Sequence, residues 1–355
     1  MPSHCVAMAD YLTLKQVLQS KVSTRESEMS LIDNLCRSYF RFHSEPADKV
    51  CLFFHGFTAG PYQFIPMADT LHKAGCNVLV PLLPGHGLAG QWGASNPPPL
   101  VDDPRVYLKF GLQWLRIAQR MGAKVIVGGL SGGATLATWL AIEKADAIYR
   151  TLLFAPYFNS SSKVIDLFVK HIDTYFEWEK LLGPSYPGFE LSALRAVLRI
   201  AKYNFKRVKE APIAPIFMIS SESDRAVNNY DHQRFFEAAL EHQPYCWYNS
   251  FDRVLDIPHT MMTEAEGNQF TNLLNVITKA YIESNLTWHE VEEIAYRMTK
   301  RRTFNSVVAE LGWKDKVSRD MPAMMTLVDK WDIAVKRELK GRQGWRRHRR
   351  RKDDW

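Results

Sequence analysis

The residue best suited to covalent chemistry is Ser131, which lies in the glycine-rich sequence GLSGG at residues 129–133. This sequence fits the pattern G-x-S-x-G. A serine on a sharp turn from a strand into a helix occupies strained backbone angles, and the residues two before and two after it must lack bulk. The pattern therefore predicts a serine nucleophile whose hydroxyl stands clear of a sheet, with the N-terminus of a helix behind it.

The flanking sequence supplies the strand and the helix that such a turn requires. Residues 125–127 are β-branched and predict a strand, and a helical pattern begins at Ala134. The uncharged stretch 125–142 is 18 residues long and so meets the usual length for a membrane span. Its central glycines and its change from strand to helix periodicity argue against a span.

The base that such a serine needs is predicted to be His259. It follows the last predicted strand in the sequence DIPHT at 256–260. A loop after a strand suits a mobile base, whereas His232, His242 and His289 fall in predicted helices.

The acid that would orient this base is predicted to be Asp224, which lies just after the predicted strand 216–220. Glu222, Asp252 and Asp256 are close enough in sequence to replace it. The loop HGFT at 55–58 follows an apolar strand, and the backbone N–H groups of Phe57 and Gly132 are expected to form an oxyanion hole. Such donors are worth roughly 3 to 4 kcal/mol each.

The order Ser131, Asp224, His259 is that of the α/β-hydrolases, and the sequence resembles this superfamily, in particular its carboxylesterases and monoacylglycerol lipases. The resemblance covers residues 48–285. The matching segments are HGFTAG at 55–60, PLLPGHG at 81–87, GLSGG at 129–133, SESD at 221–224 and PH at 258–259.

The resemblance implies a role for each site residue. Ser131 would attack a carbonyl, His259 would take the proton and return it to the leaving alcohol, and Asp224 would fix the imidazole tautomer. No metal or organic cofactor is needed. Two departures stand out: Pro258 replaces the usual glycine, which predicts a stiffer or displaced histidine loop, and Gly132 replaces a bulkier residue, which predicts a wider pocket floor.

Alternating strands and helices predict the α/β class, an α/β-hydrolase fold with a mostly parallel sheet and helices on both faces. This core is assigned to residues 38–156 and 212–285, and its last helix is expected at residues 265–284. The interval 157–211 is expected to be a helical cap of two or three helices without a strand. Its helical pattern shows two apolar stripes, the first at residues 164, 165, 168, 172, 175 and 176 and the second at residues 191, 194, 198, 201 and 205. Three apolar residues of this cap are predicted to bind substrate: Phe168, Phe176 and Trp178.

The two ends lie outside the resemblance. Residues 1–37 are predicted to be an N-terminal helical extension with a helix at 9–22, residues 286–339 a C-terminal helical extension, and residues 340–355 a basic, disordered tail. In the C-terminal extension, Thr287 with Glu290 predicts a capping box, Gly312 the end of the second helix, and Asp320 with Pro322 the start of the third. The net charge of +7 belongs to the C-terminal end, because residues 336–355 hold ten Lys or Arg and three Asp or Glu. This end is expected either to be a solvated charged segment or to contact an anionic membrane surface, in preference to nucleic acid.

The five cysteines include no C-x-x-C pair, and the first residues show no secretory signal. The expectation is therefore a cytoplasmic protein with reduced thiols, either free or peripheral to a membrane, of undetermined oligomeric state. The expected function is a serine esterase or lipase that acts on a small-molecule ester or lipid with an apolar acyl group. An acyltransferase, a thioesterase, or a ligand-binding protein on the same scaffold remains open.

Overall fold

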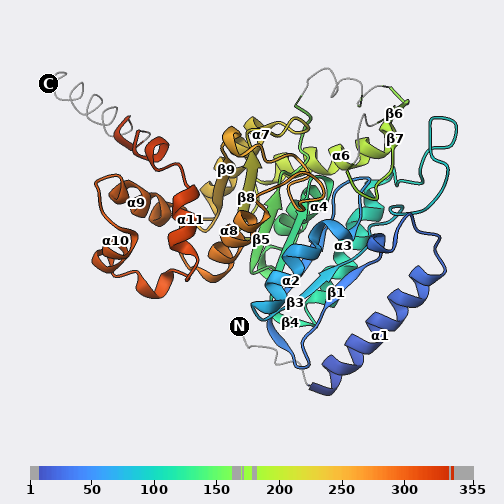
Figure 1. Cartoon of the computed structure of the whole chain (residues 1–355), viewed down its shortest axis with the longest axis horizontal. Helices are drawn as coiled ribbons and strands as arrows, with labels where there is room; N and C mark the ends of the chain where they lie inside the picture. The colour runs from blue at the N-terminus through green and yellow to red at the C-terminus, as the bar shows by residue number, and fades with distance from the viewer. Residues whose placement is uncertain (1–7, 162–168, 170–171, 178–181, 336, 340–355) are drawn as a thin grey trace. The chain divides into compact units, whose positions relative to one another are not determined.

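The computed structural model describes residues 8–161, 169, 172–177, 182–335 and 337–339, and the chain divides into two compact units, Met1–Asn275 and Val276–Trp355. The first unit is built on one large sheet (Figure 1). Its strand order is β1-β3-β2-β4-β5-β8-β9, and every neighbouring pair is parallel except β1 with β3. The strands are β1 (Tyr39–Arg41), β2 (Ala47–Phe54), β3 (Cys76–Val80), β4 (Gly122–Leu130), β5 (Arg150–Phe154), β8 (Ile216–Ser221) and β9 (Trp247–Phe251).

The central strands are covered on both faces, as their apolar sequences predict. Residues 50–54 of β2 are all fully buried although their side chains alternate between the faces of the sheet. The prediction of a mostly parallel sheet with helices on both faces is thereby confirmed. The helices of this part of the chain are α2 (Ile65–Lys73), α3 (Pro104–Ala118), α4 (Gly132–Glu143), α6 (Leu191–Arg207) and α7 (Asn229–His242). Helix α8 (Thr271–Glu283) begins in the first unit and ends in the second.

The uncharged stretch 125–142 is divided between β4 and α4, with Ser131 at the junction. It is therefore a strand, a turn and a helix, as predicted. Among the helices of the described residues, none combines the length and the apolar character needed to cross a bilayer.

The prediction that residues 157–211 contain no strand is wrong. Strands β6 (Tyr175–Glu177) and β7 (Gly188–Glu190) form an antiparallel pair, in which Phe176 lies opposite Phe189. Apolar residues at 175 and 176 fit a short strand as well as a helical stripe, so periodicity could not separate the two. A Cβ at Gly188 would lie 2.3 Å from the carbonyl oxygen of Phe176, so the pairing requires glycine there.

The rest of this interval holds the other predicted apolar stripe. Helix α6 buries Leu191, Leu194, Leu198 and Ala201 on one side. Much of the first predicted stripe, including Phe168, and also Trp178 lie outside the described residues.

Helix α1 (Met8–Ser27) is tied to the start of the sheet by side-chain hydrogen bonds. The Tyr11 hydroxyl donates to the backbone oxygen of His43, and Glu26 accepts from the backbone N–H and the hydroxyl of Ser38. The predicted N-terminal helix is present and longer than the 9–22 pattern suggested.

The second unit is helical in its described part, with α9 (Trp288–Met298), α10 (Phe304–Leu311) and α11 (Met321–Leu327). Thr287 and Glu290 form the predicted capping box, and Gly312 ends α10 with a φ of 70°. Asp320 precedes α11 as predicted, but its carboxylate pairs with Lys279 and does not cap the helix. The tail 340–355 lies outside the described residues.

Candidate active site

Ser131 occupies the strained turn that its sequence predicts. Its φ of 55° and ψ of −118° join the end of β4 to the first residue of α4. A Cβ at Gly129 would lie 2.4 Å from the carbonyl carbon of Gly133, and one at Gly133 would lie 2.2 Å from the carbonyl oxygen of Phe54. Both glycines of the pattern are therefore required by close backbone contact, which fixes the serine at the carboxyl edge of the sheet.

His259 lies beside this serine, with its Nε2 atom 2.9 Å from the Ser131 hydroxyl oxygen. Its loop follows β9 and the short 3-10 helix η4 (Arg253–Leu255), and the Ser221 hydroxyl anchors it by donating to the backbone oxygen of Ile257 at 2.6 Å. The displacement expected from Pro258 does not occur, because the imidazole still reaches the hydroxyl.

Asp224 completes a hydrogen-bonded series with these two residues. Its Oδ2 atom lies 2.7 Å from His259 Nδ1, and its Oδ1 accepts the backbone N–H groups of Ala226 at 2.8 Å and Val227 at 3.2 Å. An ionised carboxylate accepts hydrogen bonds only, so Nδ1 carries the proton and Nε2 presents its lone pair to the serine.

The competing histidines and acids are placed elsewhere. His232 is fully buried and bonded to the Ser220 hydroxyl and the backbone oxygen of Pro156. His242 and His289 lie on exposed helix surfaces. Glu222 and Asp252 accept hydrogen bonds from the nearby backbone of residues 253 and 254.

The charges of Asp224 and His259 stabilise one another. Burial raises the pKa of Asp224, but the His259 charge and the hydrogen bonds to this carboxylate outweigh burial, and the pKa lies below its ordinary value. Burial lowers the pKa of His259, yet the adjacent Asp224 carboxylate, with a smaller contribution from Glu266, holds it above the ordinary value. The site is therefore suited to an imidazole that gains a proton during a reaction.

The two predicted oxyanion donors lie at one place beside Ser131. Gly132 is the first residue of α4, a position whose N–H has no partner within the helix. A Cβ at Gly132 would lie 3.3 Å from the Cβ of Phe57, so the loop and the helix start are adjacent. In the part of the chain that the structure describes, no residue accepts the N–H of Phe57.

A cavity of about 360 Å³ opens over Ser131 and His259. Its wall is largely apolar and is built in large part by the interval 157–211. Its acidic and basic side chains are those of Arg225, Glu266 and His259. Phe176, one of the three predicted substrate-binding residues, lines it. The apolar lining from this interval includes Val169, Phe176, Leu182, Phe189, Leu191 and Leu194.

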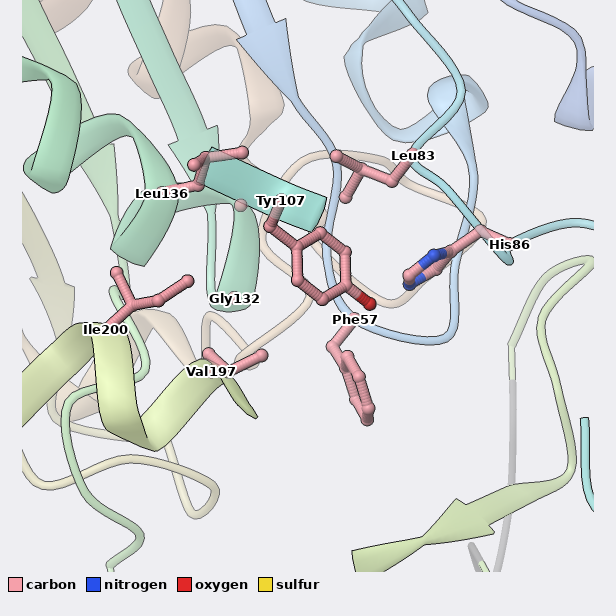
Figure 2. A pocket seen from close by; sticks show the side chains of 9 residues that line it. Phe57, Leu83, His86, Tyr107, Gly132, Leu136, Val197 and Ile200 are labelled. Atoms are coloured by element: carbon pink, nitrogen blue, oxygen red, sulfur yellow. The ribbon is translucent and has the colours of Figure 1, made fainter. Parts of the chain in front are cut away.

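A second, much smaller cavity is lined by Phe57 and Gly132, the residues of the two predicted oxyanion donors, together with apolar residues such as Leu136 and Val197 (Figure 2). Its volume of about 10 Å³ is close to that of one water molecule. Gly132 lines this cavity and is not among the residues that line the large one, so the predicted widening of the pocket floor is wrong. A side chain at 132 would not point into the large cavity, because its Cβ would lie against the side chains of Phe57, at 3.3 Å, and Val197, at 3.6 Å.

Sequence reasoning missed Glu266, whose side chain is buried in the wall of the large cavity. It accepts hydrogen bonds from Tyr62, Gln63 and Thr263. Residues 265–284 were expected to be one helix, but α8 begins at Thr271, and residues 265–270 continue the histidine loop. The available signal was the sequence TEAEGN at 263–268, which lacks a helical apolar pattern and contains a glycine.

Comparisons with known proteins agree with this architecture. The model of the Alpha/beta hydrolase family matches residues 51–308. A thermostable monoacylglycerol lipase from Bacillus sp. (strain H-257) is 33% identical over 105 residues, which is 30% of this chain and 40% of that protein. The match thus spans less than half of the relative's length.

Solved structures share the fold at low sequence identity. One of two metagenome-derived lipolytic enzymes superposes with a TM-score of 0.55 at 16% identity, covering 72% of this chain and 99% of that one. The monoacylglycerol lipase of Paleococcus ferrophilus gives a TM-score of 0.52 at 13% identity, covering 68% and 95%. The expected α/β-hydrolase fold is confirmed.

Proposed function

Because the chain belongs to the alpha/beta hydrolase family, we propose that it is a serine hydrolase that cleaves carboxylic esters of apolar acyl groups through an acyl-enzyme. One observation carries the proposal. The Ser131 hydroxyl lies 2.9 Å from His259 Nε2, and His259 Nδ1 lies 2.7 Å from Asp224, at the base of an apolar cavity. These are hydrogen-bond distances for a nucleophile, its base and an orienting acid.

In the proposed acylation, the Ser131 oxygen attacks the ester carbonyl carbon while His259 Nε2 takes the hydroxyl proton. The carbonyl oxygen becomes an anion facing the N–H groups of Phe57 and Gly132. The bond between the carbonyl carbon and the alcohol oxygen then breaks, and His259 gives its proton to that oxygen. Asp224 stabilises the imidazolium between these two proton transfers.

Deacylation repeats the steps with water as the nucleophile. His259 takes a proton from water, whose oxygen attacks the acyl carbon, and returns a proton to the Ser131 oxygen as the acid leaves. Each turnover consumes one ester and one water and yields one alcohol and one carboxylic acid. No redox step occurs, and the four proton transfers of one turnover, two in acylation and two in deacylation, use the same imidazole nitrogen.

The cavity supports an apolar acyl group as the substrate feature. Phe176, Leu182 and Phe189 face the space above the serine. A lining of this kind favours an alkyl or aryl chain, because each Å² of apolar surface that binding removes from water contributes about 25 cal/mol. The matched Bacillus relative, named a monoacylglycerol lipase, supports glycerol monoesters as members of the substrate class.

The proposal is tested with purified protein and p-nitrophenyl esters of rising acyl length, followed by a monoacylglycerol. We expect Ser131→Ala to abolish hydrolysis and labelling by a fluorophosphonate probe, while circular dichroism shows an unchanged fold. His289→Ala, at an exposed histidine, is the matched control and should keep both. Hydrolysis retained in Ser131→Ala would exclude the mechanism, and acyl esters formed with an added alcohol or thiol would identify a transferase.

For the basic C-terminal end we propose contact with an anionic membrane surface on the cytoplasmic side. Residues 346–352 read RRHRRRK, and each basic residue near such a surface contributes about 1 kcal/mol. Deletion after Leu339 should abolish sedimentation with phosphatidylserine vesicles at low salt, without lowering hydrolysis of soluble esters. Equal sedimentation of the full and shortened chains, or binding to DNA in place of vesicles, would reject this contact.

A further inference from the structure

Glu266 is a buried carboxylate that the proposed reaction does not use. Its residue is 3% exposed, yet it lines the same cavity as Ser131 and His259. Burying a carboxylate is costly unless hydrogen bonds compensate. Here three side chains donate to it: the Tyr62 hydroxyl at 3.0 Å and Gln63 Nε2 at 2.8 Å bind Oε1, and the Thr263 hydroxyl at 3.0 Å binds Oε2.

Two of these donors belong to the oxyanion segment, defined as residues 56–63. Gln63 uses both ends of its amide: Nε2 donates to Glu266, and Oε1 accepts the backbone N–H of Gly56 at 2.8 Å. Gly56 directly precedes Phe57, whose N–H is the proposed oxyanion donor. The position of the carboxylate is therefore transmitted through one side chain to the peptide next to that donor.

Glu266 is equally tied to the histidine segment, defined as residues 257–268. The Thr260 hydroxyl donates to the Glu266 backbone oxygen at 3.1 Å, and the Glu266 N–H donates to the Thr263 hydroxyl at 3.2 Å. Thr260 is the neighbour of His259. One residue thus joins, by hydrogen bonds, the segment that carries the base to the segment that carries an oxyanion donor.

We propose that Glu266 is a positioning residue that holds the oxyanion segment and the histidine segment in their reactive arrangement, with its negative charge favouring the protonated form of His259. This inference rests on the proposed function. It assigns to Glu266 no contact with the reacting atoms. A purely structural link would not need the charge, since a glutamine could accept the hydrogen bonds of Tyr62 and Gln63 at a lower cost of desolvation.

The surroundings of Glu266 make its charge sensitive to pH. Burial raises its pKa to about 7, against the lowering effect of its three donors and of His259. Among the described residues, the titratable groups that face it are Tyr62 and His259, and Arg225 lines the same cavity. Burial and the adjacent Glu266 keep the pKa of Tyr62 far above its ordinary value, so its hydroxyl remains a donor.

The test compares Glu266→Gln with the full chain, with kcat and KM measured from pH 5 to 9 on one p-nitrophenyl ester. We expect kcat to fall roughly tenfold with KM changed less than about twofold, since a misplaced oxyanion donor acts in the transition state. Glu266 and His259 titrate as a coupled pair over the same pH range, so removal of the carboxylate should leave the acidic limb of kcat/KM to His259 alone. We expect this limb to move to lower pH, because the ionised fraction of Glu266 no longer supports the protonated form of His259. A structural role alone would leave this limb in place.

Further variants separate the effect of the charge of Glu266 from the effect of its side-chain length and hydrogen bonds. Glu266→Asp keeps the charge but is one methylene shorter, so kcat should fall while the acidic limb stays near that of the wild type. Gln63→Met removes the link to Gly56 and should lower kcat by a similar factor, with a double variant, Gln63→Met with Glu266→Gln, showing less than the product of the two losses. Glu264→Gln, at an exposed acid two residues away, is the control and should behave as wild type.

The outcomes distinguish a failure of the Glu266 inference from a failure of the proposed hydrolase function. If Ser131→Ala is inactive while folded Glu266→Gln keeps kcat within twofold and an unshifted acidic limb, the positioning role of Glu266 is wrong and the hydrolase mechanism stands. If Ser131→Ala remains active, the function itself fails. Thermal unfolding of each variant verifies that a low kcat comes from folded protein.

Discussion

Ser131 and Glu266 line the same cavity but are held in place by different means. Ser131 is fixed by backbone contacts of two glycines, where a Cβ would clash: Gly129 meets Gly133 in the same turn, and Gly133 meets the carbonyl groups at the end of β2. Glu266 is fixed by side chains more than 200 positions away along the chain, those of Tyr62 and Gln63. The nucleophile is therefore held by backbone packing around a short sequence pattern, and the proposed positioning cluster is held by side chains that only tertiary folding brings together.

The comparison predicts that the backbone contacts around Ser131 tolerate the least change in sequence. In Gly133→Ala the new methyl carbon would lie 2.2 Å from the Phe54 carbonyl oxygen and 2.4 Å from that of His55. Both contacts are with backbone, which cannot rotate away. We expect a loss of about 3 kcal/mol or more in the free energy of unfolding, measured by urea denaturation, together with loss of ester hydrolysis.

Gly93→Ala is the matched control, because a Cβ there meets nothing within 4 Å. It should unfold at the same urea concentration as the wild type. Normal stability and activity in Gly133→Ala would show that the turn around Ser131 can relax, and the contrast with Glu266 would disappear.

The same distinction explains what could be predicted from the sequence. The turn at 129–133, the capping box of Thr287 and Glu290, and the alternation of strands and helices depend on neighbours in sequence, and all are present as predicted. The positions of Asp224 and His259 followed from the order of parallel strands, whose carboxyl ends meet at one edge. The structure brings both to Ser131.

What the sequence did not reveal depends on partners far apart in the chain. The strand pair β6 and β7 needs glycine at 188, opposite residue 177, because a Cβ there would meet the backbone oxygen of residue 176. What a side chain at 132 would meet depends on Val197 in α6. In the sequence, Glu266 resembles any other acid at the start of a helix. Only the folded structure shows that the side chains of residues 62 and 63 donate hydrogen bonds to it. Neither periodicity nor composition specifies such contacts.

A smaller effect on stability is predicted for the cluster around Glu266, and this effect depends on pH. The pKa of Glu266 is about 7 in the folded chain against 4.5 for an exposed glutamate, so between these values the folded state binds more protons than the unfolded state. Stability from this group is therefore fully present below pH 4.5 and is lost as pH rises through 7. The loss amounts to as much as about 3 kcal/mol.

Glu266→Gln removes this dependence, so the variant should gain stability relative to the wild type between pH 5 and pH 8. The measurement is the difference in free energy of unfolding between the two proteins at each pH. The difference cancels the contributions of other groups, such as His86 and His232, whose pKa values burial lowers. A constant difference across this range would mean that Glu266 is ionised throughout.

The smallest predicted effect tests whether several hydrogen-bond donors contribute to the stabilisation of Glu266. Tyr62→Phe removes one of the two hydrogen bonds to Oε1 and leaves that of Gln63. A hydrogen bond to a charged group is worth about 1.5 to 3 kcal/mol, and the remaining donors to Glu266 soften its loss, so we expect a decrease of about 1 to 2 kcal/mol in the free energy of unfolding at pH 8. At pH 5 the decrease should be smaller, because a protonated Glu266 gains less from that donor. A decrease that is equal at both pH values would assign the effect to packing of the Tyr62 ring, and Glu266 would then be bound to the oxyanion segment through Gln63 alone.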